Sequence, residues 1–218
     1  MNKIKIAFQG ERGAYSHIAS EVLFKNAEIK TCVTFEETFK TAFDDENYKI
    51  IIPLENSLAG RVADIHYLLP KYKLQIYSEH FQNVEHSLLV KQGTTIKDVK
   101  YVRSHAQAIG QCQKFIKKNN FKTIVSADTA GSAKDLAASE DNSIGAIASE
   151  LSAQIYKLKI LEKNVEDEKG NVTRFLIMGK SVAQPEFEEN KRYITSCIFR
   201  LKSTPSALYK CLGGFATN

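Results

Sequence analysis

The sequence lacks a long uncharged apolar run, and its first residues leave no room for a signal peptide. The segment 1–6 already alternates as a β-strand does, whereas a secretory signal needs a basic segment and an apolar core before the mature protein begins. A membrane-spanning helix would need about 20 apolar residues in succession. We therefore expect a cytoplasmic protein with reduced thiols and no membrane partner.

Motifs for metals, nucleotides and nucleic acids are missing too. The cysteines show no C-x-x-C spacing and the histidines form no H-E-x-x-H pair, so the ligand pattern of a zinc site is absent. Gly10-x-x-Gly13 is too short for a dinucleotide fingerprint, and there is no P-loop. The net charge of +5 comes from scattered lysines rather than a basic patch. We expect no metal, no organic cofactor and no nucleic-acid partner.

The 218 residues are 43% hydrophobic and 25% charged, which is enough to bury the core of one large or two small soluble domains. Ile50–Ile52 is a wholly apolar run ended by Pro53, typical of a strand buried on both faces of a parallel sheet. Alternating periodicities of 2 and 3.6 residues predict an α/β fold with doubly wound sheets in two lobes. The expected strands are 4–8, 50–52, 88–90, 101–102, 123–125 and 144–148, and the expected helices are 16–23, 34–43, 106–118, 129–139 and 150–156.

Composition also predicts the domain boundaries. One lobe is expected to comprise 1–78 with 166–180, and the other 79–165, followed by an acidic linker at 181–193. Beyond the linker, 195–202 alternates like a strand, and a helix is expected from Thr204-Pro205 to Gly213-Gly214. One strand and one helix cannot form a stable core alone, so 194–218 is expected to be an incomplete βα piece.

The segment 171–175 carries the most specific chemistry. It reads Asn-Val-Thr-Arg-Phe at the entrance to an apolar strand, and it sets the hydroxyl of Thr173 beside the guanidinium of Arg174. The planar fork of arginine fits a carboxylate, and the hydroxyl can donate or relay a proton. The alternative is an ordinary solvated arginine at a strand end.

Polar side chains also follow the predicted strands, where open α/β sheets bind ligands. Each turn places a hydroxyl or amide at a helix N-terminus, where free backbone N–H groups favour anions. Helix capping is the alternative explanation for any single turn, but together with Arg174 they predict a site for a small di-acid. The turns are 10–16, 55–57, 104–105, 126–129 and 149.

Five of these segments, taken in order, resemble prephenate dehydratase, an enzyme of phenylalanine biosynthesis. The matching stretches run from 6 to 16, from 53 to 60, from 104 to 112, from 146 to 151 and from 171 to 175. The resemblance implies a fold similar to type 2 periplasmic binding proteins. It also implies conversion of prephenate to phenylpyruvate, water and carbon dioxide, without metal or organic cofactor.

The resemblance implies the roles of individual residues as well. Thr173 would be the catalytic residue, and the substrate-binding residues would be Arg174, Asn56, Ser57, Ser104, Gln111, Ser16 and Phe175. The segment 194–218 looks like the beginning of a regulatory ACT domain, with Ser206 where the family usually has glycine. A homodimer or homotetramer is expected, and phenylalanine is not expected as an effector because the ACT-like piece is incomplete.

Two alternatives remain open at the level of sequence. The substrate could be arogenate, which carries an amine where prephenate carries a ketone. The chain could also be a non-catalytic binding or sensing module of the same two-lobed architecture.

Overall fold

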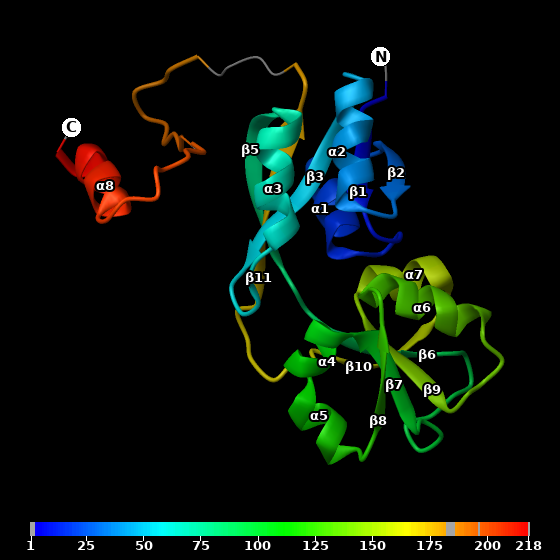
Figure 1. The fold of residues 1–218 in the computed structure, drawn as a ribbon. Helices are drawn as coiled ribbons and strands as arrows, with labels where there is room; N and C mark the ends of the chain where they lie inside the picture. Colours follow the sequence, from blue (N-terminus) through cyan, green and yellow to red (C-terminus); the bar gives the residue numbers. More distant parts are fainter. Residues whose placement is uncertain (1–2, 182–185, 196, 218) are drawn as a thin grey trace. The chain divides into compact units, whose positions relative to one another are not determined.

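The computed structural model describes residues 3–181, 186–195 and 197–217. The chain divides into a larger unit, residues 1–182, and a smaller unit, residues 183–218. The described part of the larger unit contains two β-sheets, and helices cover both faces of each sheet (Figure 1). This is the two-lobed α/β architecture with doubly wound sheets that the sequence predicts.

The first sheet has the strand order β2-β1-β3-β11-β5, with β4 paired to β3. β1 pairs in parallel with β2 and β3, whereas β11 runs antiparallel to β3 and β5. The sheet is therefore mixed, not wholly parallel as the apolar run suggested. Its elements are β1 (Lys5–Gln9), α1 (Tyr15–Leu23), β2 (Glu28–Cys32), α2 (Phe35–Asp44), β3 (Tyr48–Asn56), β4 (Gly60–Arg61), α3 (Ala63–Tyr72), β5 (Gln75–Asn83) and β11 (Val172–Gly179).

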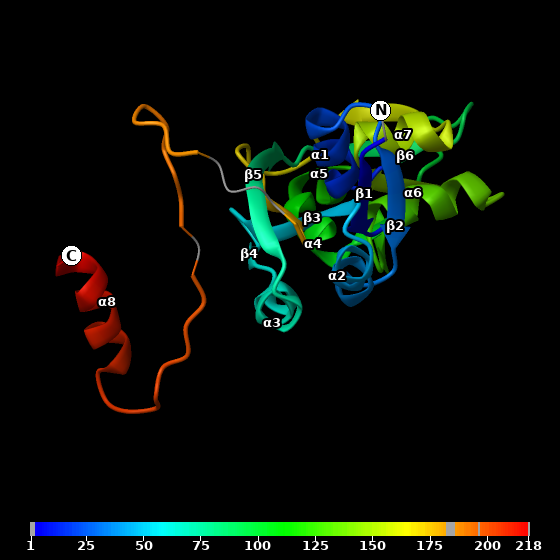
Figure 2. The same cartoon turned by 90° about the horizontal axis from the view of Figure 1, so that it is seen from above.

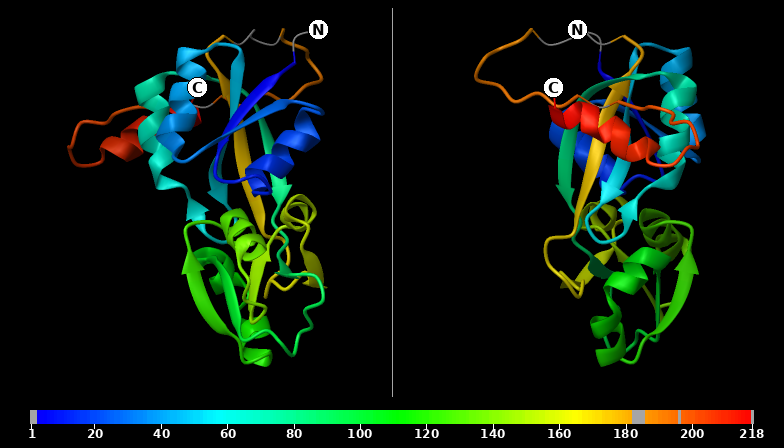
Figure 3. Two further views of the ribbon diagram at one scale, coloured as in Figure 1. Left: turned by 90° about the vertical axis from the view of Figure 1, so that its right-hand side faces the viewer. Right: turned by 60° about the vertical axis from the view of Figure 1, so that its left-hand side comes forward.

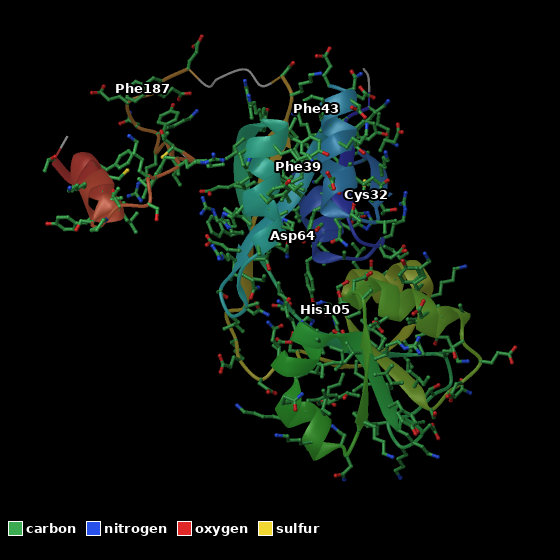
Figure 4. The ribbon with its side chains drawn as sticks, viewed as in Figure 1. Cys32, Phe39, Phe43, Asp64, His105 and Phe187 are labelled. Atoms are coloured by element: carbon green, nitrogen blue, oxygen red, sulfur yellow. The ribbon has the colours of Figure 1, made fainter. Side chains whose placement is uncertain are left out.

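Both faces of the first sheet are buried because side chains alternate along each strand. Ile50 and Ile52 pack on the α2 and α3 side together with Phe39 of α2, which is labelled in Figure 4. Ile51 points the other way and packs with Ala19 of α1. Figure 2 shows α1 on one side of the sheet and α2 with α3 on the other. Three consecutive isoleucines thus belong to opposite cores.

A capping box forms the start of α2. Thr34 Oγ1 accepts a hydrogen bond from the Glu37 backbone N–H at 3.1 Å. The Glu37 carboxylate in turn accepts from the Val33 N–H at 2.9 Å. Two backbone donors that the helix cannot satisfy are thereby paired, which fixes where the helix begins.

The second sheet has the order β10-β6-β9-β7-β8. β7 is parallel to β8 and β9, and β6 is antiparallel to β9 and β10, so this sheet is mixed as well. Its elements are β6 (Ser87–Val90), β7 (Tyr101–His105), α4 (Ala106–Gln111), α5 (Gln113–Lys118), β8 (Lys122–Ser126), α6 (Thr129–Ala138), β9 (Ile144–Ala148), α7 (Glu150–Tyr156) and β10 (Lys159–Lys163).

The helices of the second lobe also cover both faces of their sheet. Ile109 of α4 and Ile116 of α5 pack on one face, and Leu136 of α6 packs on the other. The single helix predicted over 106–118 is divided at Cys112, whose φ of −121° and ψ of 25° lie outside the helical region. Gln111 is consequently the last residue of a short helix.

Among the residues that the structure describes, five elements were not predicted: β2, β4, α3, β5 and β10. β5 alternates poorly and is largely exposed, so the sequence carries little strand signal there. Pro53 was expected to end a strand, but β3 continues to Asn56. The register with β11 shifts between Arg174 and Phe175, opposite Pro53, and such a bulge accommodates a residue that has no N–H to donate.

The smaller unit differs from its prediction. No strand is assigned to residues 195 and 197–202, and position 196 of the predicted strand lies outside the described residues, as do positions 182–185 of the predicted linker. The helix α8 spans Ala207–Thr217 and continues through Gly213-Gly214. Glycine disfavours a helix by about 1 kcal/mol relative to alanine, which here does not end it.

The loop after β1 joins the lobes. The Gly13 carbonyl oxygen accepts hydrogen bonds from Ser149 Oγ at 2.6 Å and Ser152 Oγ at 3.1 Å. The neighbouring Arg12 carbonyl accepts from the Tyr156 hydroxyl at 2.9 Å. Gly13 has a φ of +96°, and a Cβ at this position would lie 2.4 Å from Ser152 Oγ. Only glycine allows this approach of the loop to α7.

We predict that Gly13→Ala lowers the free energy of unfolding by roughly 2–4 kcal/mol, because a strained φ is combined with overpacking against Ser152. Gly60→Ala is the matched control, since Gly60 also has a positive φ of +81° but no atom within 4 Å of an added Cβ. Urea unfolding should show a loss of about 1 kcal/mol for the control. Equal losses in the two variants would mean that the contact with α7 adds nothing.

Candidate active site

Thr173 lies at the beginning of β11 and is 8% exposed. Its Oγ1 accepts a hydrogen bond from Asn56 Nδ2 at 2.9 Å, and the two residues are directly opposite each other in the β3–β11 register. No described residue accepts the hydroxyl proton of Thr173. The side chain therefore presents an unengaged O–H donor whose oxygen is already held in place.

Asn56 ends β3, and its amide orientation follows from the backbone. Asn56 Oδ1 accepts from the N–H groups of Leu58 at 3.0 Å and Ala59 at 2.9 Å. A carbonyl oxygen is required there, so the NH₂ group faces Thr173 and Asn171. The distance from Asn56 Nδ2 to Asn171 Oδ1 is 2.6 Å. Thr173 consequently receives a neutral donor and no competing charge.

Gln111 brings the second lobe into this cluster from the end of α4. Its Oε1 accepts from Asn171 Nδ2 at 3.0 Å and lies 2.9 Å from His86 Nε2. Among the described residues its Nε2 has no hydrogen-bond partner. Gln111 is only partly buried, so it presents a free amide N–H₂.

His86 is a member of this cluster that the sequence analysis did not identify. It is 2% exposed, and its Nδ1 lies 2.9 Å from the Tyr15 hydroxyl. Burial lowers the pKa of His86, while the hydrogen bond with Gln111 and the charge of Glu166 act in the opposite direction. Its partners are 25 and 71 residues away in sequence, so no local pattern could have found them.

The side chain of Arg174 does not lie beside that of Thr173. Neighbouring residues of a strand point to opposite faces, so the side-by-side arrangement inferred from the sequence is incorrect. Arg174 Nε lies 2.8 Å from Glu79 Oε2, and Nη1 lies 3.1 Å from Glu55 Oε1. The guanidinium thus links β11 to β5 and β3 on the face opposite Thr173.

The other predicted site residues are placed as follows. Ser57 Oγ accepts from the Val172 N–H at 3.0 Å and donates to the Gly170 carbonyl at 3.2 Å, so it fastens the entrance of β11. Ser16, on α1, is 7% exposed, and within the described residues its hydroxyl has no partner. Phe175 is 2% exposed in the core between the first sheet and α1.

Ser104 is not brought into the cluster. It is fully buried on β7, and its Oγ donates to the Ile147 carbonyl of β9 at 2.6 Å. The next residue, His105, is labelled in Figure 4 at the end of β7. Its Nδ1 accepts from the Gln107 N–H at 3.3 Å and caps α4. Ser104 therefore connects strands of the second sheet, and His105 fixes the start of the helix that carries Gln111.

Cys112 follows Gln111 and is buried in the second core. Burial, with a contribution from Glu166 and Asp167, raises the pKa of its thiol. In the residues that the structure describes, no cluster of His, Cys, Asp and Glu side chains is arranged to hold a metal ion. None of the described helices combines the length and apolarity that crossing a bilayer requires.

The comparison with known families gives a clear match. The family profile described as prephenate dehydratase (PDT) matches residues 6–183. A "Bifunctional N-acyl-homoserine lactone acylase/prephenate dehydratase" of Komagataeibacter europaeus is 40% identical over 97% of this chain and 75% of its own length. The "Prephenate dehydratase" of Methanocaldococcus jannaschii is 36% identical over 99% of this chain and 79% of its own.

A plant relative is matched over a smaller share of its length. The "Arogenate dehydratase/prephenate dehydratase 2, chloroplastic" of Arabidopsis thaliana is 36% identical, over 99% of this chain but only 56% of the relative. This chain thus spans little more than half of that protein. Among solved structures, prephenate dehydratase from Arthrobacter aurescens in complex with L-Phe superposes with a TM-score of 0.85 at 22% identity, over 98% of this chain and 72% of that one.

The fold and the cluster define a two-lobed α/β protein whose polar groups meet where the lobes join. The chain belongs to the prephenate dehydratase family, in which relatives carry the names of prephenate and arogenate dehydratases.

We predict that Arg174→Lys lowers the stability by about 1 kcal/mol, which corresponds to roughly 2–4 °C in Tm for a chain of this size, and changes KM less than about twofold. A lysine cannot reach Glu79 and Glu55 together as the guanidinium does. Arg61→Lys is the control, because Arg61 is exposed on β4. An unchanged Tm with a raised KM would instead assign the guanidinium to the substrate.

We also predict that the larger unit loses stability as pH falls through about 6.5. Burial lowers the pKa of both His86 and His17 from the ordinary value of 6.5. The unfolded chain then binds more protons than the folded one below that pH, so the stability present at pH 7.5 is lost on acidification. Urea unfolding at pH 7.5 and pH 5.5 measures the loss. His86→Gln should show a smaller loss, and an identical one would exclude His86 as a cause.

Proposed function

We propose that this chain catalyses the decarboxylating dehydration of prephenate to phenylpyruvate. One observation carries the proposal: the oxygen of Thr173 is held by Asn56 Nδ2 while its own proton has no acceptor among the described residues. A hydroxyl in that state is suited to donate to a departing oxygen. The family membership supplies the substrate class.

The reaction needs little chemistry from the protein. The bond from the ring to its carboxylate carbon breaks, and its electron pair forms a ring double bond while the bond from the ring to the hydroxyl oxygen breaks. The products are carbon dioxide, an aromatic ring and a hydroxide that takes up one proton to become water. Thr173 is too weak an acid to ionise, so it acts as a hydrogen-bond donor or relay to that leaving oxygen.

Two neutral donors complete the proposed site. Gln111 presents a free amide N–H₂, and Ser16 presents a free hydroxyl. Hydrogen bonds to a charged acceptor are about twice as strong as those between neutral groups. We infer that these donors bind the carboxylates of the substrate. Asn56 holds Thr173, and Arg174 strengthens the strands from the opposite face.

Prephenate is preferred to arogenate in this proposal because the relatives matched over 75% and 79% of their lengths carry the name prephenate dehydratase. The plant relative carries both names. Turnover of each substrate by the purified chain, compared as kcat/KM, decides between them. Binding of prephenate without formation of phenylpyruvate would instead support the non-catalytic binding module.

The acylase activity in the name of the Komagataeibacter relative is not part of the proposal. Acyl transfer commonly uses a Ser, Thr or Cys activated by an adjacent base. Over the ranges that the structure describes, no such side chain is hydrogen-bonded to a histidine ring, and burial keeps the Cys112 thiol protonated. Incubation with an acyl-homoserine lactone tests this directly.

We predict that Thr173→Val lowers kcat by roughly 10²–10⁴ with little change in KM. Valine keeps the shape of threonine but has no hydroxyl, and Asn56 Nδ2 still has Asn171 Oδ1 and the Val172 carbonyl as acceptors. The production of phenylpyruvate measures the effect.

Thr173→Ser is the matched control for this variant. It retains the hydroxyl and should keep most of the activity. Wild-type turnover by the valine variant would remove Thr173 from the mechanism, whereas absence of turnover in the wild-type chain would reject the proposed function.

A further inference from the structure

The backbone contacts of Asn56 determine which end of each side-chain amide near Thr173 donates and which end accepts. The two backbone N–H groups that bind Asn56 Oδ1 leave its Nδ2 as a donor to Asn171 Oδ1. Asn171 must therefore donate from its own Nδ2, which it does to Gln111 Oε1. Gln111 is thereby turned with its oxygen towards Asn171 and its NH₂ group away.

His86 provides the second donor to the same oxygen. Because Gln111 Oε1 is an acceptor, the 2.9 Å contact requires a proton on His86 Nε2. His86 Nδ1 is then an acceptor and shares the single Tyr15 hydroxyl proton with the Glu85 carbonyl; the two acceptors lie 2.9 Å and 2.6 Å from the Tyr15 oxygen. When His86 is protonated, Nδ1 donates to the Tyr15 oxygen, and the Tyr15 proton goes to the Glu85 carbonyl alone. The Nε2–H is present in both states.

These residues lie where the chain passes between the sheets. His86 is in the segment from β5 to β6, and Asn171 is at the end of the segment from β10 to β11. The two segments pair through Val84 N–H to Asn171 O at 2.8 Å and Val165 N–H to His86 O at 2.9 Å. Gln111 is therefore hydrogen-bonded to both connecting segments, through His86 and Asn171. The other nitrogen of the imidazole contacts the Tyr15 hydroxyl.

We propose that His86 is a positioning residue that acts through Gln111: its Nε2–H holds the Gln111 oxygen so that the amide N–H₂ faces the substrate carboxylate. The inference rests on the proposed function, because the proposed substrate supplies the carboxylate that the Gln111 amide N–H₂ would bind. The groups that face the imidazole are the Tyr15 hydroxyl and the Gln111 amide, while the Glu166 carboxylate accepts from the His86 backbone N–H at 2.9 Å.

The kinetic test is a double-mutant cycle with prephenate. Gln111→Met removes the amide at similar volume and should lower kcat/KM roughly 10- to 100-fold, mainly through KM. His86→Leu should lower kcat/KM roughly 5- to 30-fold, also through KM. His86→Gln, which restores an N–H donor, should remain within about threefold of the wild type. In the Gln111→Met background, His86→Leu should add less than about twofold.

The cycle separates positioning from general support of the fold. If His86 only stabilised the protein, its effect would multiply with that of Gln111→Met and the glutamine variant would not rescue KM. Multiplicative effects with normal prephenate turnover overturn this inference alone. A wild-type chain without turnover overturns the proposed function and the inference with it.

The tautomer provides a test that needs no activity and is read in the wild-type protein. In ¹⁵N-histidine-labelled protein at pH 7.5, the resonance lost in His86→Gln should show Nε2 protonated and Nδ1 unprotonated. An Nε2 that carries no proton would mean that Gln111 is turned the other way, and the proposal would be wrong.

Discussion

The pairing of β11 with both β3 and β5 is the constraint on which the rest of the larger unit depends. Figure 3 shows this strand, drawn in yellow, between its neighbours in the first sheet. It follows the whole second sheet in sequence, so the chain has to leave the first lobe and return to its centre. The two passages consequently lie side by side and hydrogen-bond to each other. Thr173 begins β11 at that place, which is why the cluster forms at the junction rather than inside one lobe.

The cluster is built from neutral groups whose orientation is inherited from the backbone. Asn56 donates to the oxygen of Asn171, and Asn171 donates to the oxygen of Gln111. The orientation of each amide therefore determines that of the next. Buried networks of this kind hold their members rigidly where the hydrogen bonds are satisfied. The groups left over, a hydroxyl and an amide N–H₂, are donors. In the proposed reaction, a site of neutral donors would bind the carboxylates without holding them so strongly that the loss of one as carbon dioxide is hindered.

Much of the fold could be predicted from the sequence, because Ile50–Ile52 and the capping residues Thr34 and Glu37 express local rules. Thr173 and the turn that contains Asn56 could be assigned to one site from the sequence, whereas Gln111 followed only from the family resemblance. The error over Arg174 was avoidable, since strand alternation alone separates neighbours. His86 could not be found, because its importance arises from contacts between distant segments, and β5 was missed because its outward side chains hide its periodicity.

The distribution of cysteines has a practical consequence for labelling the protein. Cys32 and Cys112 are buried in the larger unit, and the Cys112 thiol is held in its protonated form, whereas Cys197 is exposed and Cys211 is partly exposed in the smaller unit. Thiolates, not thiols, react with maleimides and iodoacetamide. Under native conditions such reagents will attach to the smaller unit and leave the residues around Thr173 unmodified. A fluorophore or spin label can thus be placed on the chain without removing any cysteine from its core.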